Sequence, residues 1–495
     1  MNKSVLAFLF LIFAFTTVNS QSRKISADSV VVTQHEVTIN GNKVSYTATT
    51  GTQPVWDENG KPIASLFFTY YKKDGAKNAD RPLLISFNGG PGSASVWMHL
   101  AYTGPRILNI DDEGYPVQPY GFRENPFSVL DVTDIVYVNP ANTGYSRTIP
   151  ESGKEVDKSK FFGINADITY LADWLNTFVS RYERWESPKF IIGESYGGTR
   201  VSGLAYELQE RQWMYLNGVI MVSPADYNIY NSDAAISNLD LPYYAATAWH
   251  HNMLPNELQQ KDLLEVLPEV EDYTLNILMP ALARGGSVPI EEKEQIAEKM
   301  SFYSGLSKES ILAHNLRVPT DFYWKELLRK DGFTVGRLDS RYLGLDGMDA
   351  GDSPDFNAEI KSWLHSFTPA INHYLRTELG YKTDLKYYMF GPVHPWNNEN
   401  NRTRENLRTA LAENPYLNIL YQVGYYDGAC NYFATKYSMW QMDPSGKLSD
   451  RIDFKGYRSG HMMYLRSEDL KTANDDIRQF ILKSLPGDKP AIYNR

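Results

Sequence analysis

The stretch Gly193-Glu194-Ser195-Tyr196-Gly197 decides the fold of this 495-residue chain. It follows the apolar run Phe190-Ile191-Ile192 and precedes a segment whose apolar residues recur at helical spacing, namely Val201, Leu204, Ala205 and Leu208. A serine between two glycines at a sharp strand-to-helix turn has its hydroxyl pushed out of the sheet edge, where it can act as a nucleophile. The sequence therefore predicts Ser195 as the nucleophile of an α/β domain.

Strand-like and helix-like segments alternate on both sides of this turn. Short apolar strands are predicted at residues 83–87, 134–138 and 219–222, and an amphipathic helix at 164–182. Residues 28–72 are predicted to be rich in strands separated by Asn-Gly turn signals. Such alternation is typical of a mostly parallel central sheet with helices on its faces.

The alternation stops after Tyr227 and resumes at a predicted strand over residues 417–423. The intervening stretch is polar and largely helical in pattern. We therefore expect a helical cap insertion at 229–385 that divides one core into two parts, 21–228 and 386–495. A separate linker domain is the alternative interpretation.

The amino terminus has the features of a secretory signal peptide. Lys3 supplies a positive charge, residues 5–15 form an apolar run too short to span a bilayer, and Val18 and Ser20 are small. We expect a signal peptide at 1–20, cleavage before Gln21, and a secreted or periplasmic protein without membrane contact after signal removal. A buried first helix is the alternative.

The bulk composition excludes some classes of function. A formal net charge of −10 disfavours nucleic acid as a partner, because nucleic-acid backbones call for a basic surface. Cys430 is the one cysteine, so no intrachain disulfide can form, and we expect it to be a packed side chain. No His-Glu-x-x-His motif or cysteine cluster occurs, so neither a metal nor another cofactor is expected.

A serine hydroxyl needs a base, and the base needs an orienting carboxylate. On this architecture they follow the serine in the order acid, then histidine. Asp427 comes shortly after the predicted strand at 417–423, and His461 follows a predicted strand at 452–454. Both are expected at the carboxyl ends of their strands, the edge where the Ser195 turn opens. We predict Asp427 and His461 as the partners of Ser195.

The glycine-rich loop at residues 88–92 follows the strand that ends at Phe87. Glycines expose backbone N–H groups, and a loop of this kind beside the nucleophile can donate one hydrogen bond to an oxyanion. The N–H of Tyr196 is expected to donate the second. A plain structural turn is the alternative, and a phosphate loop is disfavoured because no Lys-Ser/Thr pair follows.

Taken together, these motifs resemble the serine carboxypeptidase family, the S10 peptidases. The matching residues are 88–92 with Ser93-Ala94-Ser95, Pro140 with Gly144-Tyr145-Ser146, residues 193–198, residues 427–431, and Gly460-His461-Met462. They occur in the family's order between residues 65 and 485. The lack of paired cysteines and the stretch at 96–100 resemble the bacterial branch of the family.

The resemblance implies an α/β-hydrolase fold, a Ser195–His461–Asp427 triad, and oxyanion donors at the Gly90 and Tyr196 amides. It also implies that Asn88, the Gly89 amide and Glu194 bind the free carboxylate at the end of a peptide substrate. Two carboxylates that close cannot both stay ionised. A protonated Glu194 would donate to the substrate, so binding is expected to be tighter at acidic pH.

The implied activity is that of a serine carboxypeptidase, which releases C-terminal amino acids from peptides through an acyl-enzyme. Departures from the family pattern include Ser86, where tryptophan is common, and Met463-Tyr464, where Val-Pro is usual. The departure at Ser86 bears on carboxylate recognition and so leaves strict exopeptidase action open. An esterase or acyltransferase with the same triad, or an inactive hydrolase-like binding protein, remain as alternatives.

Overall fold

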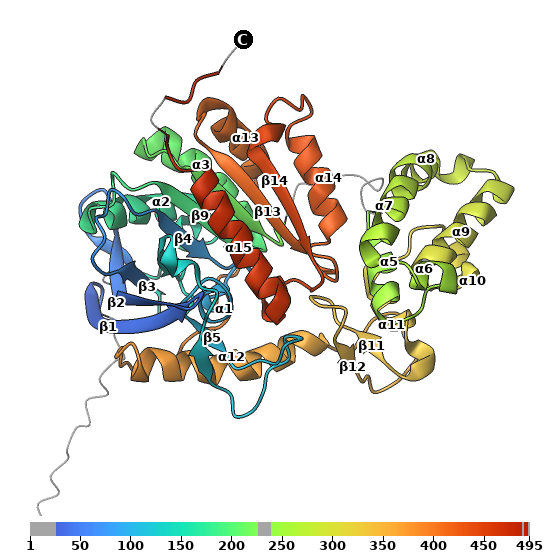
Figure 1. The fold of residues 1–495 in the computed structure, drawn as a ribbon, viewed down its shortest axis with the longest axis horizontal. Coiled ribbons are helices and arrows are strands. Elements are labelled where there is room, and N and C mark those ends of the chain that lie inside the picture. Colours follow the sequence, from blue (N-terminus) through green and yellow to red (C-terminus); the bar gives the residue numbers. More distant parts are fainter. Residues whose placement is uncertain (1–25, 152, 226–238, 488–489, 494–495) are drawn as a thin grey trace, which may run out of the picture.

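A ten-stranded sheet runs through the molecule (Figure 1). Its order is β1 (Ser29–Ile39), β2 (Asn42–Trp56), β3 (Pro62–Lys73), β7 (Asp134–Val138), β4 (Leu83–Phe87), β9 (Lys189–Glu194), β10 (Gly218–Val222), β13 (Asn418–Gly424) and β14 (Ile452–Tyr457), with β8 (Arg147–Thr148) paired to β3. From β7 to β14 neighbouring strands are parallel, whereas β1, β2, β3 and β7 pair antiparallel. The predicted mostly parallel sheet is confirmed.

The computed structural model describes residues 26–151, 153–225, 239–487 and 490–493. The expected signal peptide at 1–20 and its cleavage site lie outside the described residues. Among the helices in those ranges, none has the length and apolar character that crossing a bilayer requires.

Helices cover both faces of the sheet, because its central strands are buried along their whole length and need apolar partners on each side. One face packs against α1 (Val96–Ala101), α12 (Ala358–Thr377) and α15 (Ser467–Lys483). The other packs against α2 (Ile164–Arg181), α3 (Tyr196–Gln212) and α13 (Thr403–Glu413). A small ribbon of β5 (Arg106–Leu108) and β6 (Phe122–Glu124) accompanies the first face.

A helical lobe follows residue 239 and appears in green and yellow in Figure 1. It contains α5 (Leu241–His250), α6 (Asn256–Gln259), α7 (Leu263–Tyr273), α8 (Met279–Arg284), α9 (Ile290–Ser304), α10 (Lys308–Ala313) and α11 (Thr320–Glu326), followed by the hairpin of β11 (Thr334–Val335) and β12 (Leu343–Gly344). The lobe has its own apolar core. A further cluster joins α5 and α7 to β13 and α14 (Tyr432–Met442), so the lobe is packed onto the carboxyl-terminal half of the sheet.

Helix α12 lies inside the range expected for the insertion, yet it packs with the sheet. Its side chains Trp363, Phe367 and Tyr374 belong to the same apolar cluster as Tyr71 of β3 and Trp97 of α1. The apolar core of the helical lobe contains no residue of α12 in the described ranges. The end of the insertion at residue 385 stays a prediction, and by packing α12 belongs to the layers of the sheet.

Candidate active site

Ser195 lies in the sharp turn between β9 and α3. Its backbone has φ +60° and ψ −127°, a combination that costs energy for any residue with a side chain. A Cβ at Gly193 would lie 2.1 Å from the carbonyl oxygen of Gly197, so only glycine lets the strand and helix pass this closely. The Ser195 N–H donates to the carbonyl of Val222 over 3.0 Å and ties the turn to the end of β10. The half-buried serine therefore stands where the sequence predicts it.

Asp427 and His461 meet at the carboxyl ends of β13 and β14. His461 Nδ1 lies 2.6 Å from Asp427 Oδ2, and both side chains are buried. The other carboxylate oxygen, Oδ1, accepts the N–H groups of Ala429 at 2.9 Å and Cys430 at 3.0 Å, which fixes the carboxylate toward the imidazole. Burial acts to lower the pKa of His461, but the charge of Asp427 and its hydrogen bond outweigh burial and raise this pKa above its ordinary value. The pair is therefore suited to hold a proton on the ring.

Ser195 and His461 line the same cavity and are anchored to the same strand end. Ser195 is bonded to Val222, and the carbonyl of His461 accepts the hydroxyl of Ser223 at 2.8 Å. In the described part of the chain no hydrogen bond joins the serine hydroxyl to the imidazole. Such bonds commonly tighten only when substrate is bound. The structure thus brings Ser195 and His461 to one cavity, with Asp427 behind the imidazole and the bond between base and orienting acid already made.

The glycine loop after β4 lies against the Ser195 turn. A Cβ at Gly89 would approach the Tyr196 nitrogen to 2.5 Å, so the loop and the start of α3 are in contact. Gly90 has φ +106°, and its N–H finds no acceptor among the described residues. Two backbone donors, from Gly90 and Tyr196, therefore belong to segments that touch beside the serine.

A buried ion pair behind this loop was not predicted. Arg200 of α3 donates from Nη1 to the carbonyl of Asn88 at 2.5 Å and from Nε to Asp167 of α2 at 2.7 Å. Asp167 also accepts the Tyr196 hydroxyl at 3.1 Å. The sequence carried a usable signal, because Asp167 and Arg200 interrupt the buried apolar stripes of two neighbouring helices, and charges there must pair.

Glu194, the residue before Ser195, is 3% exposed and lines the cavity. The Asn88 amide donates to its Oε2, and the Tyr464 hydroxyl donates to its Oε1 over 2.8 Å. Burial raises the pKa of Glu194 to about 7, against the opposing effects of His461 and Tyr464. The structure brings Asn88 and Glu194 together, and their role in carboxylate binding stays a prediction. Tyr464 was missed, and its only signal was the unusual residue pair after His461-Met462.

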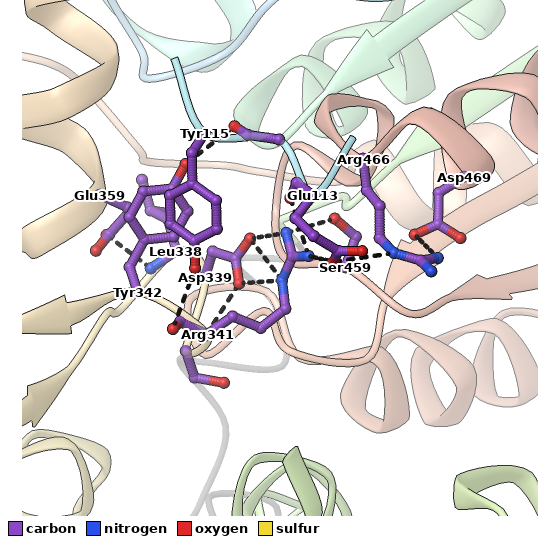
Figure 2. A network of polar contacts seen from close by, with 12 residues as sticks. Glu113, Tyr115, Leu338, Asp339, Arg341, Tyr342, Glu359, Ser459, Arg466 and Asp469 are labelled. Carbon is purple, nitrogen blue, oxygen red and sulfur yellow. Dashed lines mark hydrogen bonds and ion pairs between the residues drawn. The ribbon is translucent and has the colours of Figure 1, made fainter. Parts of the chain in front are cut away.

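A segment of the expected insertion, residues 337–341, lies across the loops that carry Asp427 and His461. The Arg337 carbonyl accepts the Gly428 N–H at 3.0 Å, and the Leu338 carbonyl accepts the His461 N–H at 2.6 Å. Figure 2 shows that Arg341 binds Asp339 at 2.6 Å and the Ser459 hydroxyl at 3.1 Å. The insertion therefore contacts both loops through backbone and side chains, which sequence pattern did not predict.

The cavity has a volume of about 770 Å³ and lies between the sheet edge and the helical lobe. The core contributes Gly89, Gly90, Glu194, Ser195, Cys430 and His461, and the expected insertion contributes Val318, Trp324 and Asn357 among others. Cys430 is buried, as expected for a packed side chain, and burial raises the pKa of its thiol. In the described ranges, one group of side chains has the atom types and spacing that could ligate a metal: Asp427, Cys430 and His461, whose potential ligand atoms lie within 4.8 Å of one another.

Comparison with known proteins connects this geometry to a family. Residues 42–283 match the model of the family described as serine carboxypeptidase. The chain is 27% identical over 166 residues to a carboxypeptidase Y homolog of Arthroderma benhamiae, covering 33% of this chain and 30% of the relative. It is 29% identical over 145 residues to the pheromone-processing carboxypeptidase KEX1 of Saccharomyces cerevisiae, covering 29% of this chain and 19% of the relative.

The comparisons support one family, the serine carboxypeptidases. The fold agrees, because the crystal structure of the Saccharomyces cerevisiae prohormone-processing carboxypeptidase superimposes with a TM-score of 0.54 at 15% identity, covering 88% of this chain and 92% of that one. The chain therefore has the α/β-hydrolase fold predicted from its sequence. In sequence, the matched segments span less than a third of each of these serine carboxypeptidase relatives.

Proposed function

We propose that this chain is a serine carboxypeptidase that removes the C-terminal amino acid of peptides through an acyl-enzyme. The observation that carries the proposal is one cavity lined by Ser195, His461 and Glu194, with Asp427 bonded to the imidazole at 2.6 Å. A nucleophile, an oriented base and a buried acid beside the nucleophile are what cleavage next to a free carboxylate requires.

In this mechanism His461 takes the Ser195 proton as the hydroxyl oxygen attacks the last peptide carbonyl. Asp427 keeps the ring in register and stabilises the imidazolium that forms. The Gly90 and Tyr196 amides donate to the oxyanion, where preorganised donors lower the barrier most. His461 then protonates the leaving amino acid, and water attacks the acyl-enzyme with His461 again as the base.

Carboxylate recognition is assigned to Asn88, the Gly89 amide and Glu194. Glu194 has a pKa raised to about 7 by burial, so below that value it carries a proton that it can donate to a substrate carboxylate. Above pH 7 it is ionised and repels that carboxylate. The KM for a free-acid substrate should therefore rise as pH passes through about 7, whereas the KM for an amide should not. A Glu194→Gln variant with an unchanged pH dependence would contradict this assignment.

The expected export of the chain and its place in the bacterial branch of the family are part of the same proposal. We assign residues 1–20 as a signal peptide and infer a secreted or periplasmic enzyme of the bacterial branch, supported by the single cysteine. The lobe at 229–385 is proposed to cap the cavity and set side-chain preference, supported by the lining residues Val318 and Trp324.

The test compares three substrates with the same acyl part: a blocked dipeptide with a free carboxylate, its C-terminal amide, and a simple ester. We expect kcat/KM for the free acid to exceed that for the amide by roughly 10-fold or more, because a buried hydrogen-bonding group loses its partner in the amide. Equal rates on acid and amide would indicate an esterase or acyltransferase. Failure of a fluorophosphonate probe to label Ser195, with Ser195→Ala as the negative control, would indicate an inactive binding protein.

A further inference from the structure

One side chain links the loop that carries His461, here called the histidine loop, to Glu194, the residue that precedes the nucleophile. Tyr464 lies in the short helix η7 (Met463–Leu465), three residues beyond His461, and its side chain is fully buried. Its hydroxyl donates to Glu194 Oε1 over 2.8 Å. The position of the Glu194 carboxyl therefore depends on a group delivered by another strand and loop.

The ring of Tyr464 is held in place by its neighbours. It stacks on Tyr102, with ring centroids 4.6 Å apart and planes 12° apart. Tyr102 in turn donates to Gln422 Oε1 at 2.6 Å, and the Gln422 amide donates to the Tyr457 hydroxyl at 2.8 Å. A stacked ring in a hydrogen-bonded core has little rotational freedom, so the hydroxyl points at one acceptor.

Glu194 is consequently held by two neutral donors, one on each oxygen. Asn88 binds Oε2, and the orientation of its amide is set by the Met98 N–H, which donates to Asn88 Oδ1 at 3.2 Å. In the described ranges no arginine or lysine forms an ion pair with Glu194. The titratable groups that face it are His461, Asp427, Tyr464 and Tyr102. A carboxyl group in this setting can keep its proton and offer it to an acceptor in the cavity.

We propose that Tyr464 is a specificity-determining residue, which orients the Glu194 carboxyl so that the site selects substrates ending in a free carboxylate over those with a blocked end. The inference rests on the proposed function and extends it, because it assigns the selection to a residue outside the predicted triad and outside the predicted carboxylate-binding set.

The direction of the pH effect follows from the hydrogen bond. A donor to an ionised carboxylate stabilises the charged form and lowers its pKa, so the Tyr464 hydroxyl holds the pKa of Glu194 below the value that burial alone would give. Removing the hydroxyl should raise this pKa. The pH at which KM for a free-acid substrate begins to rise should therefore move upward in Tyr464→Phe.

The experiment measures kcat/KM of Tyr464→Phe on the free-acid dipeptide and on its amide across the pH range. We expect a loss of roughly 10-fold or more on the acid, the scale of a hydrogen bond to an ionisable group, and a loss of less than about 3-fold on the amide. Tyr137→Phe is the matched control, because it removes an equally buried hydroxyl, bonded to Thr103, on the same face of the sheet. Its ratio of acid to amide rates should equal that of the wild type.

Equal losses of kcat/KM on both substrates would overturn the assignment of Tyr464. So would an unchanged pH at which KM for the free-acid substrate begins to rise. A wild-type enzyme without preference for the free acid would instead overturn the proposed function, and the inference with it. If Tyr464→Phe does not fold, Glu194→Gln still decides the matter. That variant should lose both the preference for the free acid and the rise of KM with pH. Retention of both would exclude Glu194 as the residue that selects the free carboxylate, and Tyr464 with it.

Discussion

At the amino ends of β4, β7 and β9 the buried acid is Asp134, and at the carboxyl ends of β9 and β13 the buried acids are Glu194 and Asp427. Asp134 is surrounded by cations: Arg184 binds Oδ2 at 2.6 Å, and Arg81 binds Oδ1 at 3.1 Å. Arg184 is itself fully buried. Glu194 by contrast is bonded to an amide and a phenol, and Asp427 to an imidazole and two backbone N–H groups.

The partners decide what each buried acid can do. Two arginines hold Asp134 in a buried ion-pair network, so this carboxylate stabilises the start of three strands. An imidazole can take or release a proton, and a carboxyl with neutral donors can be protonated. The amino ends of these strands are therefore suited to stability, and the carboxyl ends to chemistry.

The largest expected effect on catalysis, and the strongest test of this comparison, comes from Asp427→Asn. The new amide would keep the two backbone bonds but present an N–H to His461 Nδ1, which selects the tautomer that cannot accept the Ser195 proton. We expect kcat to fall by roughly 10³- to 10⁴-fold, with little change in the midpoint of thermal unfolding. Steady-state kinetics and calorimetry of the same preparation check both statements. A variant that keeps a tenth of the wild-type kcat would exclude Asp427 from the proposed triad.

At the opposite ends of the strands, Arg184→Met should lower stability and leave kcat unchanged. Among the residues that the structure describes, it leaves Asp134 with Arg81 as its one remaining cationic partner in a buried site. Breaking such a pair costs about 3–5 kcal/mol of unfolding free energy. Because the cavity lies at the other ends of the strands, kcat per folded molecule should not change. Urea unfolding and active-site titration measure the two quantities separately. A fall in kcat per labelled site would show that the two ends are coupled.

Between these extremes lies Arg341→Lys, at the segment that crosses the histidine loop. Lysine keeps the charge but loses the fork that binds Asp339 and Ser459 together (Figure 2). The backbone of His461 should then be held less firmly, and kcat should fall by roughly 10-fold through misplacement of the ring. KM should change little, since Arg341 does not line the cavity. A rise in KM at constant kcat would assign Arg341 to binding rather than to positioning.

Local pattern was enough to predict the sheet and the positions of Ser195, Asp427 and His461. Each of these follows a strand by a few residues, and the carboxyl ends of parallel strands share one edge. The glycine before His461 also has a local cause, since a Cβ at Gly460 would lie 2.4 Å from the Cβ of Asp339.

The partners from distant segments could not be predicted in the same way. Tyr464 reaches Glu194 across a separation of 270 residues, and no periodicity encodes that contact. The pairing of Arg184 with Asp134 depends on β7 lying next to β4, which is a property of strand order rather than of either segment. Asp167 and Arg200 were within reach of prediction, because each interrupts an apolar helical stripe. The packing of α12 on the sheet could not be predicted, because its amphipathic pattern suits packing on the sheet and packing in the helical lobe equally.

The smallest expected effect belongs to the exposed ion pair between the lobe and the histidine loop. Arg458 binds both oxygens of Asp262, at 2.6 and 2.5 Å, but both side chains are well exposed. Asp262 also caps α7 by accepting the Leu264 N–H at 2.9 Å.

Asp262→Asn keeps the cap, because asparagine is an equally good N-cap residue, and removes only the charge. Exposed pairs contribute about 0–1 kcal/mol, so we expect a decrease in unfolding free energy of at most about 0.5 kcal/mol and an unchanged kcat. The decrease should vanish in 1 M NaCl, where screening removes the attraction in the wild type as well. A loss that persists in salt, or that reaches the size expected for Arg184→Met, would mean that the contact between lobe and loop behaves as a buried interface and that the division between stabilising and catalytic ends is too simple.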